Sequence, residues 1–445
     1  MIAPKPEPRA EKVSLWRYFR LFRQDILSAQ PERLYTAKMA VFKTPFFRSF
    51  MINEPDLIAE VLKARPDDFP KSERIGEGLR PLLGKSVFLT NGETWKAQRR
   101  IIDPAFEGGR IKAAYPAMFE AAERAVVALQ GKSKIDIERH ASQAAADVIF
   151  RTLFSMPIED RVASEVYAAF QAHQRAQPIL NLAAFVPLPA WMPRPRRKEV
   201  RQTAQIIRRL IAQLCDERAA EIKANRAPAD LATKIMTTPD PQTGRCFETQ
   251  EMIDQVAIFF LAGHETSASA LAWSLYLLAA SPDWQDEVAS EVSGVDLSDF
   301  SELSKLKLTH NVFREALRLY PPVPMMVRAA QQTEHFRKCD IKPGDQIVIS
   351  PWHLHRNGRY WDTPDHFDPS RWDVTSRCPR EAYKPFSSGP RVCPGAGFAM
   401  VEGPLLLARL VQSYRFEPCN TPVPVAHLTV RSRDGIALKV SARDR

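Results

Sequence analysis

One short segment near the carboxyl end constrains the possible folds more than any other feature of the chain. It covers residues 386–397, reads FSSGPRVCPGAG, and carries one cysteine, Cys393, among three glycines and two prolines. Glycine permits the tight turns that direct backbone N–H groups at a sulfur atom. Such donors stabilise a thiolate that binds a metal. A plain buried cysteine in a turn is the alternative, and the spacing of the residues around it favours the metal ligand.

The residues around Cys393 each have a use beside a metal-bound thiolate. Phe386 can shield the sulfur from water, and Gly389 and Gly395 allow the turns. Arg391, two residues before the cysteine, can pair with an anionic group of a cofactor. The residues that follow predict a helix whose positive N-terminal end faces the thiolate. Cys393 is therefore the candidate metal ligand.

This segment resembles the cysteine loop of the cytochrome P450 superfamily, F-x-x-G-x-R-x-C-x-G, and meets every position of that pattern. The resemblance implies haem b (iron protoporphyrin IX) with Cys393 as the axial ligand of its iron. It implies a mainly α fold with small β-sheets (α+β), in which the haem lies between a long central helix and the helix after the cysteine loop. We expect one catalytic domain over residues 1–445, with a leader and first helix over residues 1–35 and no fused reductase.

A second group of residues extends the resemblance to a buried ion-pair triad. Glu315-Ala-Leu-Arg318 is similar to the family's E-x-x-R helix, and residues at i and i+3 share one helix face. Residues 367–372, FDPSRW, resemble the P-E-R-F element, with serine and tryptophan where glutamate and phenylalanine are common. Arg371 is retained there. The resemblance implies that Glu315, Arg318 and Arg371 support the cysteine loop.

Three basic or aromatic positions are similar to residues that bind the haem propionates in the family. Trp95-Lys-Ala-Gln-Arg99 matches the W-x-x-x-R helix, and Arg328 follows a proline-rich stretch as the family's further arginine does. With Arg391, the resemblance implies that Trp95, Arg99 and Arg328 hold the propionates.

The apolar run over residues 252–280 is long enough to be considered as a membrane span. His264 and Glu265 lie in its middle, where charge is costly in a bilayer, so a buried helix is favoured. We interpret His264 as a packing or surface residue, and His353 and His355 as structural.

Within that run, Ala262-Gly-His-Glu-Thr-Ser resembles the family's A-G-x-E/D-T segment. The resemblance implies that Ala262 and Gly263 line the cofactor and that Gly263 leaves room for oxygen. Thr266 can hydrogen-bond back to a carbonyl and open the helix locally. Glu265 and Thr266 are the expected catalytic pair, delivering protons for oxygen activation.

The implied activity is insertion of one oxygen atom from O2 into a hydrophobic small molecule, such as a fatty acyl chain, a terpenoid or a polyketide. The expected pocket walls are all apolar: Ile75, Leu79, Val87, Ile258, Phe259, Ala262, Val323, Met325 and Leu428. Two alternatives remain: a haem-thiolate isomerase or dehydratase, which needs no external electrons, and a haem-based binding protein without turnover. Neither requires Thr266.

The formal net charge of +10 is compatible with an acidic protein partner. No basic run interleaved with aromatic residues indicates nucleic acid. We expect electrons to come from a separate ferredoxin and ferredoxin reductase, with Lys96 and Arg100 at the docking face. The polar N-terminus indicates no membrane anchor, and scattered cysteines without a CxxC pair favour a reducing cytoplasm. A soluble, bacterial-type monomer is expected.

Local patterns predict the main elements. A hairpin is expected over residues 37–53, strands over residues 345–350 and 428–440, and an irregular loop over residues 72–90. Apolar periodicity predicts helices over residues 55–63, 111–130, 138–154, 198–224 and 252–280. The proline-rich stretch over residues 177–195 is interpreted as a lid or a simple connection between helices.

Overall fold

The computed structural model describes residues 1–445 except 44–47, 108, 177–197, 374, 377 and 444–445. Its helices are α1 (Leu15–Gln24), α2 (Pro55–Ala59), α3 (Glu73–Leu83), α4 (Gly92–Ile102), α5 (Gly109–Val127), α6 (Ile137–Phe154), α7 (Arg161–Ala176), α9 (Lys198–Lys223), α10 (Leu231–Thr237), α11 (Thr249–Ala279), α12 (Pro282–Ser293), α13 (Lys307–Leu319), α14 (Pro351–Leu354) and α15 (Ala396–Ser413). Its strands are β1 (Met39–Lys43), β2 (Arg48–Ile52), β3 (Lys134–Asp136), β4 (Met326–Ala329), β5 (Glu334–Phe336), β6 (Cys339–Ile341), β7 (Gln346–Ile349), β8 (Tyr414–Pro418), β9 (Pro424–Ala426), β10 (Val430–Ser432) and β11 (Ala437–Ala442).

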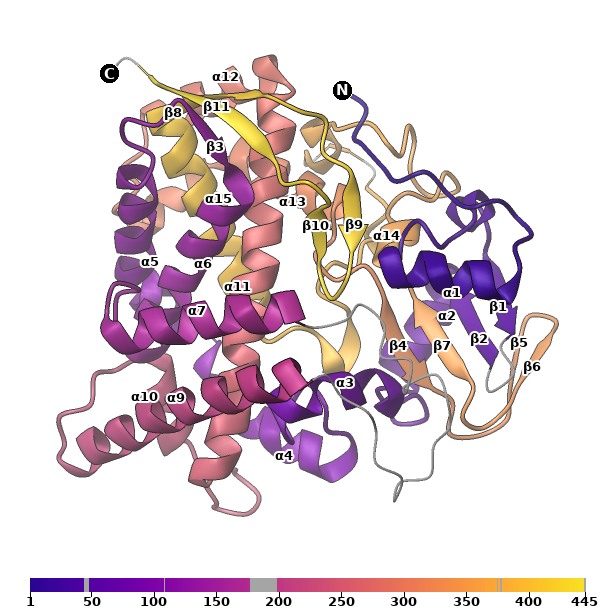
Figure 1. Ribbon diagram of the computed structural model, residues 1–445, viewed down its shortest axis with the longest axis horizontal. Helices are drawn as coiled ribbons and strands as arrows, with labels where there is room; N and C mark the ends of the chain where they lie inside the picture. The colour runs from indigo at the N-terminus through magenta and orange to yellow at the C-terminus, as the bar shows by residue number, and fades with distance from the viewer. Residues whose placement is uncertain (44–47, 108, 177–197, 374, 377, 444–445) are drawn as a thin grey trace.

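Most of the long helices gather in one part of the molecule, and the largest sheet lies in another with α1 and α2 beside it (Figure 1). That sheet has the order β1-β2-β7-β4, with β2 and β7 parallel and the other pairs antiparallel. Its buried side chains, including Phe50, Ile347 and Ile349, form a hydrophobic cluster with Ile58 and Val61 beside it. The predicted mainly α fold with small β-sheets is confirmed.

Helix α11 is the centre of the helical part. Its 31 residues extend about 45 Å, and it packs against α6, α9, α13 and α15. Most of its side chains are buried, as is typical of a helix that is apolar on every side. The run over residues 252–280 is therefore an internal helix. Among the described residues, no helix combines the length and the apolar character needed to span a membrane.

Most of the predicted elements are present, and one is wrong. The hairpin forms with Met39 opposite Ile52, although its turn falls outside the described residues. Residues 72–90 were expected to be a loop, whereas α3 occupies most of the first half. Two glycines and Pro81 weaken its helical pattern, and packing against α9 and α11 compensates. The strand expected over residues 428–440 divides at Gly435 into β10 and β11. The possible lid over residues 177–195 lies outside the described residues.

The expected ion-pair triad forms at the start of the segment that leads to the cysteine loop. The Glu315 carboxylate is fully buried and accepts two hydrogen bonds from the Arg318 guanidinium, at 2.9 and 2.7 Å. Arg371 Nε lies 3.3 Å from Glu315 Oε1, and Trp372 Nε1 donates to the other oxygen at 3.0 Å. Arg318 also donates to three backbone carbonyls of residues 355–366. The triad thus joins α13 to the long connection after α14.

Replacing Glu315 with glutamine should leave Arg318 buried without its counter-charge. Breaking a buried pair in this way costs about 3–5 kcal/mol of unfolding free energy. We expect Glu315→Gln to lower the urea midpoint strongly. Glu165→Gln, which removes an exposed partner of Arg161 at i+4 spacing, should leave that midpoint near the wild-type value. Equal midpoints for the two variants would contradict the structural role of the triad.

Candidate active site

The cysteine loop is held in a tight backbone conformation. Cys393 N–H donates to the Phe386 carbonyl at 3.0 Å, which closes the loop in front of α15. Gly389 has φ +70°, and a Cβ there would collide with the Leu62 carbonyl. Glycine is required at this position by both conformation and space. Phe386 is half-buried and packs against a small cluster that includes Phe313.

The backbone N–H of Gly395 acts on the Cys393 sulfur, as expected. Its φ is −82°, which any residue can adopt, and a Cβ there would lie at an ordinary 3.9 Å from Cys393 Sγ. The turn at this position therefore does not itself require glycine. Helix α15 begins at the next residue, Ala396. The sulfur thus lies near the positive end of an 18-residue helix.

The Cys393 side chain is accessible to solvent, but the surrounding protein desolvates its sulfur. A side chain with both properties borders a narrow internal space rather than the outer surface. Desolvation raises the pKa of the Cys393 thiol, while the Gly395 N–H and the positive charge of Arg99 act in the opposite direction. A bound metal ion would add the largest force toward the thiolate.

Cationic side chains converge around the Trp95 ring. The Arg391 and Arg99 guanidinium carbons lie 4.8 and 5.9 Å from the ring centroid. Lys71 Nζ lies 5.7 Å from it and donates to the Val87 carbonyl at 2.6 Å. Arg99 also donates to the Val392 carbonyl at 2.7 Å, which ties α4 to the cysteine loop. Sequence reasoning missed Lys71, because only its bridge to Arg328 on β4 brings it to this place.

These cations have too few counter-charges. The Nε atoms of Arg328 and Arg391 are buried without a hydrogen-bond partner in the part of the chain that the structure describes. Burial, and secondarily the charge of Arg391, lower the pKa of Arg328 to about 10. Burial and the neighbouring arginines lower the pKa of Lys71 to about 6. The acids that pair here are Asp67, 3.6 Å from Arg391, and Asp103, 2.6 Å from Arg99.

The residues present fit a haem. A cofactor with two carboxylates would supply the counter-charge that Arg328 lacks, would add to the distant Asp67 contact of Arg391, and would favour the protonated form of Lys71. Cys393 would supply the axial sulfur, and its loop already carries the N–H donor and the helix end that favour a thiolate.

One face in the middle of α11 is accessible, although most of the helix is buried. Phe259, Ala262, Gly263 and Thr266 share this face, and Ala262 is exposed. The Thr266 hydroxyl donates to the Ala262 carbonyl at 2.6 Å, as expected. The expected local opening does not interrupt the helix, which continues to Ala279.

Gly263 also affects how two helices pack. A Cβ at this position would collide with the Ile149 side chain of α6. The absent side chain therefore allows α6 and α11 to approach closely. His264, on the same turn, bonds Ser142 of α6 at 2.7 Å. Burial lowers the pKa of His264 to about 3, so it is a neutral packing residue.

Glu265 is buried and turned away from the accessible face. Gln174 of α7 donates to one carboxylate oxygen, and Thr429 Oγ1 lies 3.3 Å from the other. Arg431 of β10 completes this environment. Burial raises the pKa of Glu265, and the charge of Arg431 is the first of the influences that lower it.

A second buried acid that sequence reasoning missed lies between α11 and α15. Ser267 Oγ donates to Glu402 Oε2 at 2.8 Å, and Glu402 Oε1 has no partner within the described ranges. Burial raises the pKa of Glu402 to about 8, so it carries a proton at neutral pH. No local motif marks it, because the partner is 135 residues away.

The expected substrate-pocket residues fall in different parts of the core. Leu79, Val87, Ile258, Phe259 and Leu428 belong to or pack against the main hydrophobic core, which extends through most of the helical part. Met325 instead packs beside a separate cluster with Leu34 and Met51. Val323 is half-buried. The side chain of Ile75 lies outside the part that the structure describes.

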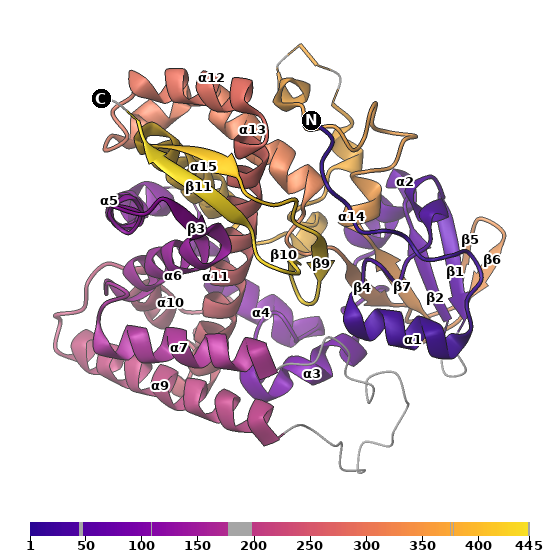
Figure 2. The same cartoon turned by 45° about the horizontal axis from the view of Figure 1, so that its top comes forward.

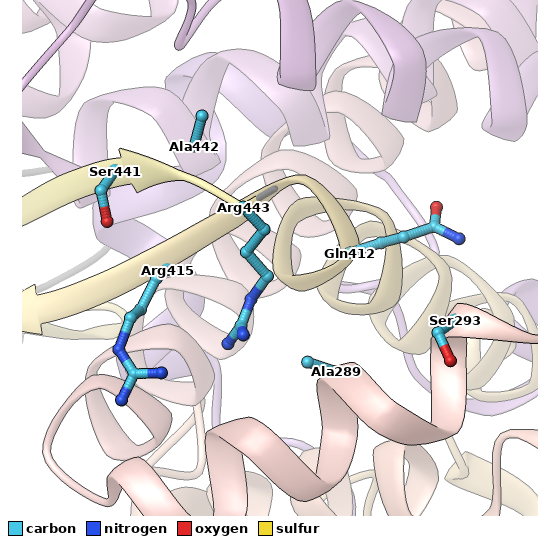
Figure 3. Close-up of a pocket in the computed structure, with 7 residues that line it drawn as sticks. All are labelled: Ala289, Ser293, Gln412, Arg415, Ser441, Ala442 and Arg443. Carbon is cyan, nitrogen blue, oxygen red and sulfur yellow. The ribbon is translucent and has the colours of Figure 1, made fainter. Parts of the chain in front are cut away.

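A surface pocket of about 430 Å³ lies elsewhere, between α12, β8 and the end of β11 (Figure 3). Arg415 and Arg443 line it, together with Gln412 near the end of α15. Gln412 is 16 residues along α15 from Ala396, or roughly 24 Å of helix. None of the expected site residues lines this pocket.

Replacing Arg328 with methionine should remove a buried cation that has no acidic partner among the described side chains. If the cluster binds haem carboxylates, loss of one charge-assisted bond should speed haem loss roughly ten- to a hundredfold. Transfer of haem to excess apomyoglobin measures this rate. Lys96→Met is the matched control, because Lys96 lies on α4 with exposed partners. Equal haem loss in both variants would exclude Arg328 from the haem site.

Comparisons with known proteins agree with this geometry. The family model described as Cytochrome P450 matches residues 37–439. The chain is 30% identical to "Cyclooctatin synthase" of Streptomyces melanosporofaciens, over 82% of this chain and 80% of the relative. It is 29% identical to "Cyclooctat-9-en-7-ol 5-monooxygenase" of the same organism (83% and 81%) and 28% identical to "Cytokinin hydroxylase" of Arabidopsis thaliana (88% and 78%). The chain therefore belongs to the cytochrome P450 family, and it is a monooxygenase of that family.

Proposed function

We propose that this monooxygenase hydroxylates a hydrophobic small molecule with haem b held by Cys393. One observation supports the site above all others. Cys393 and the Thr266 face of α11 are both accessible, and buried cations with few counter-charges lie beside the cysteine loop. Haem bound there supplies oxygen activation and transfer of the oxygen atom to carbon. The residues of the chain bind the cofactor and control where protons enter.

The division of roles follows from the positions of the side chains. Arg99, Arg328 and Arg391, with Lys71, bind the carboxylates of the cofactor. The Thr266 hydroxyl faces the internal space and holds a proton at its Oγ, anchored by the Ala262 carbonyl. Glu265 is the buried acid one residue earlier, and it supplies protons from the solvent side of α11.

The substrate is proposed from the apolar wall. Phe259 lies on the accessible face of α11, and Leu79, Val87 and Leu428 are proposed to contribute further carbon surface from the main core. A fatty acyl chain, a terpenoid or a polyketide-like molecule suits such a wall. The relatives' names specify cyclooctat-9-en-7-ol and cytokinin as molecules oxidised by those proteins.

We propose that the enzyme is cytoplasmic and monomeric, and that a separate ferredoxin with its reductase supplies its electrons.

The expected docking residues Lys96 and Arg100 need a revision. Arg100 forms a two-pronged ion pair with buried Asp240, at 2.6 and 2.9 Å, and this pair lowers the pKa of Asp240. Arg100 is thus committed to structure. Lys96 is partly exposed and pairs only with exposed acids, so it is the better candidate for docking.

Thr266→Ala should uncouple electron use from product formation. Without the hydroxyl, the site no longer controls where protons are delivered. Peroxide should therefore accumulate, and the product formed per electron should fall about tenfold or more. Coupling is measured as the amounts of product and of peroxide formed per electron delivered to the enzyme. Ser274→Ala is the control, because Ser274 makes the same bond to a carbonyl four residues back in a buried part of α11. Unchanged coupling in Thr266→Ala would favour an isomerase, a dehydratase or a binding protein.

A further inference from the structure

Arg431 lies between the solvent and the buried carboxylate of Glu265. It belongs to β10, whose hairpin with β9 lies beside α11 near the end of α7 (Figures 1 and 2). Its side chain is 43% exposed, whereas that of Glu265 is 5% exposed. Arg431 Nη2 lies 3.6 Å from Glu265 Oε2, and this arginine is therefore the surface-facing end of the contact.

Arg431 also organises the other partners of Glu265. Its Nη2 donates to Gln174 Oε1 at 3.2 Å, and Gln174 in turn donates to Glu265 Oε1. Its Nε donates to Thr429 Oγ1 at 3.4 Å, and Thr429 in turn donates to Glu265 Oε2. One guanidinium thus fixes both neutral groups that hold the carboxylate, in addition to its own charge.

The other titratable groups around Arg431 reinforce its importance. Glu138 of α6 accepts a hydrogen bond from the Ser432 N–H at 2.8 Å. Burial raises the pKa of Glu138 to about 7, the charge of Asp136 raises it further, and the charge of Arg431 lowers it. Burial lowers the pKa values of His264 on α11 and His427 before β10, and Arg431 lowers them further. Arg431 is the cation that acts on Glu265, Glu138 and both histidines.

The contacts also set the direction of Glu265. Successive residues of a helix are turned by about 100°, so the carboxylate of Glu265 and the hydroxyl of Thr266 face different ways. Arg431, Gln174 and Thr429 hold the carboxylate toward the hairpin and α7. Before Glu265 can serve Thr266, it must leave these partners.

We propose that Arg431 is a positioning residue that holds Glu265 in a waiting position and sets the pH range over which it donates a proton. The inference rests on the proposed function, in which Glu265 supplies protons. A proton from solvent binds a Glu265 carboxylate oxygen and removes its attraction to Arg431. The neutral acid is then released toward Thr266, gives up the same proton, and returns to Arg431 as the carboxylate.

The test compares four variants of the holoenzyme. Arg431→Gln removes the charge and Arg431→Lys keeps it. Arg433→Gln removes an exposed charge two residues along, where the partner is Asp434. Glu265→Gln identifies the infrared band of the Glu265 carboxylic acid, since that band is missing in the variant.

We expect Arg431→Gln to move the Glu265 infrared titration upward by about one to two pH units, because a nearby cation favours the carboxylate by that amount. Coupling that depends on a protonated Glu265 is lost as pH rises through its pKa, so this loss should move upward by the same interval. Arg431→Lys should stay near wild type, and Arg433→Gln should match wild type.

An unchanged Glu265 titration in Arg431→Gln would overturn the inference, as would an equal shift in Arg433→Gln. A shifted titration with an unshifted coupling profile would support the role of Arg431 in positioning Glu265. It would at the same time remove Glu265 from the proposed function, so the two failures are distinguishable.

Discussion

The fixed position of the Cys393 loop is the constraint on which the rest of the site depends. Three contacts from two parts of the chain hold it: the Leu62 carbonyl lies against Gly389, Arg391 donates to the Pro66 carbonyl, and Arg99 donates to the Val392 carbonyl. Backbone contacts of this kind define atomic positions more narrowly than apolar packing does. They place the sulfur at the start of α15, where a helix end favours negative charge.

The same contacts gather positive charge in a poorly solvated place. Arg391 binds the Pro66 carbonyl from the loop, and Arg99 binds the Val392 carbonyl of the loop. Arg328 and Lys71 reach the same region from β4 and its bridging segment. Burying cations without counter-charges is unfavourable. A dianionic cofactor reverses this cost, so cofactor binding and local stability are linked. The Glu315 triad separately joins α13 to the long connection that leads to the loop.

The sequence predicts best where function requires neighbouring residues. Short, fixed spacings separate Gly389 from Cys393 and Trp95 from Arg99. The hydrogen bond of Thr266 to the carbonyl four residues earlier is local as well. Lys71 and Arg431 have no such signal, because strand pairing and a hairpin bring them to their partners from distant positions. Helix α3 is missed because its glycines and Pro81 disguise a helix that tertiary packing stabilises. The close approach of Gly263 to Ile149 has no local signal either, because only the fold brings α6 against α11.

The central claim is that Cys393 binds haem iron as a thiolate. The most direct measurement is the absorption spectrum of the purified, dithionite-reduced protein under carbon monoxide, with Cys393→His as the comparison. The account predicts a strongly red-shifted Soret band in the wild-type protein and its loss in the variant. A Soret band at the position typical of histidine or neutral-thiol ligation, in folded wild-type protein, would contradict it.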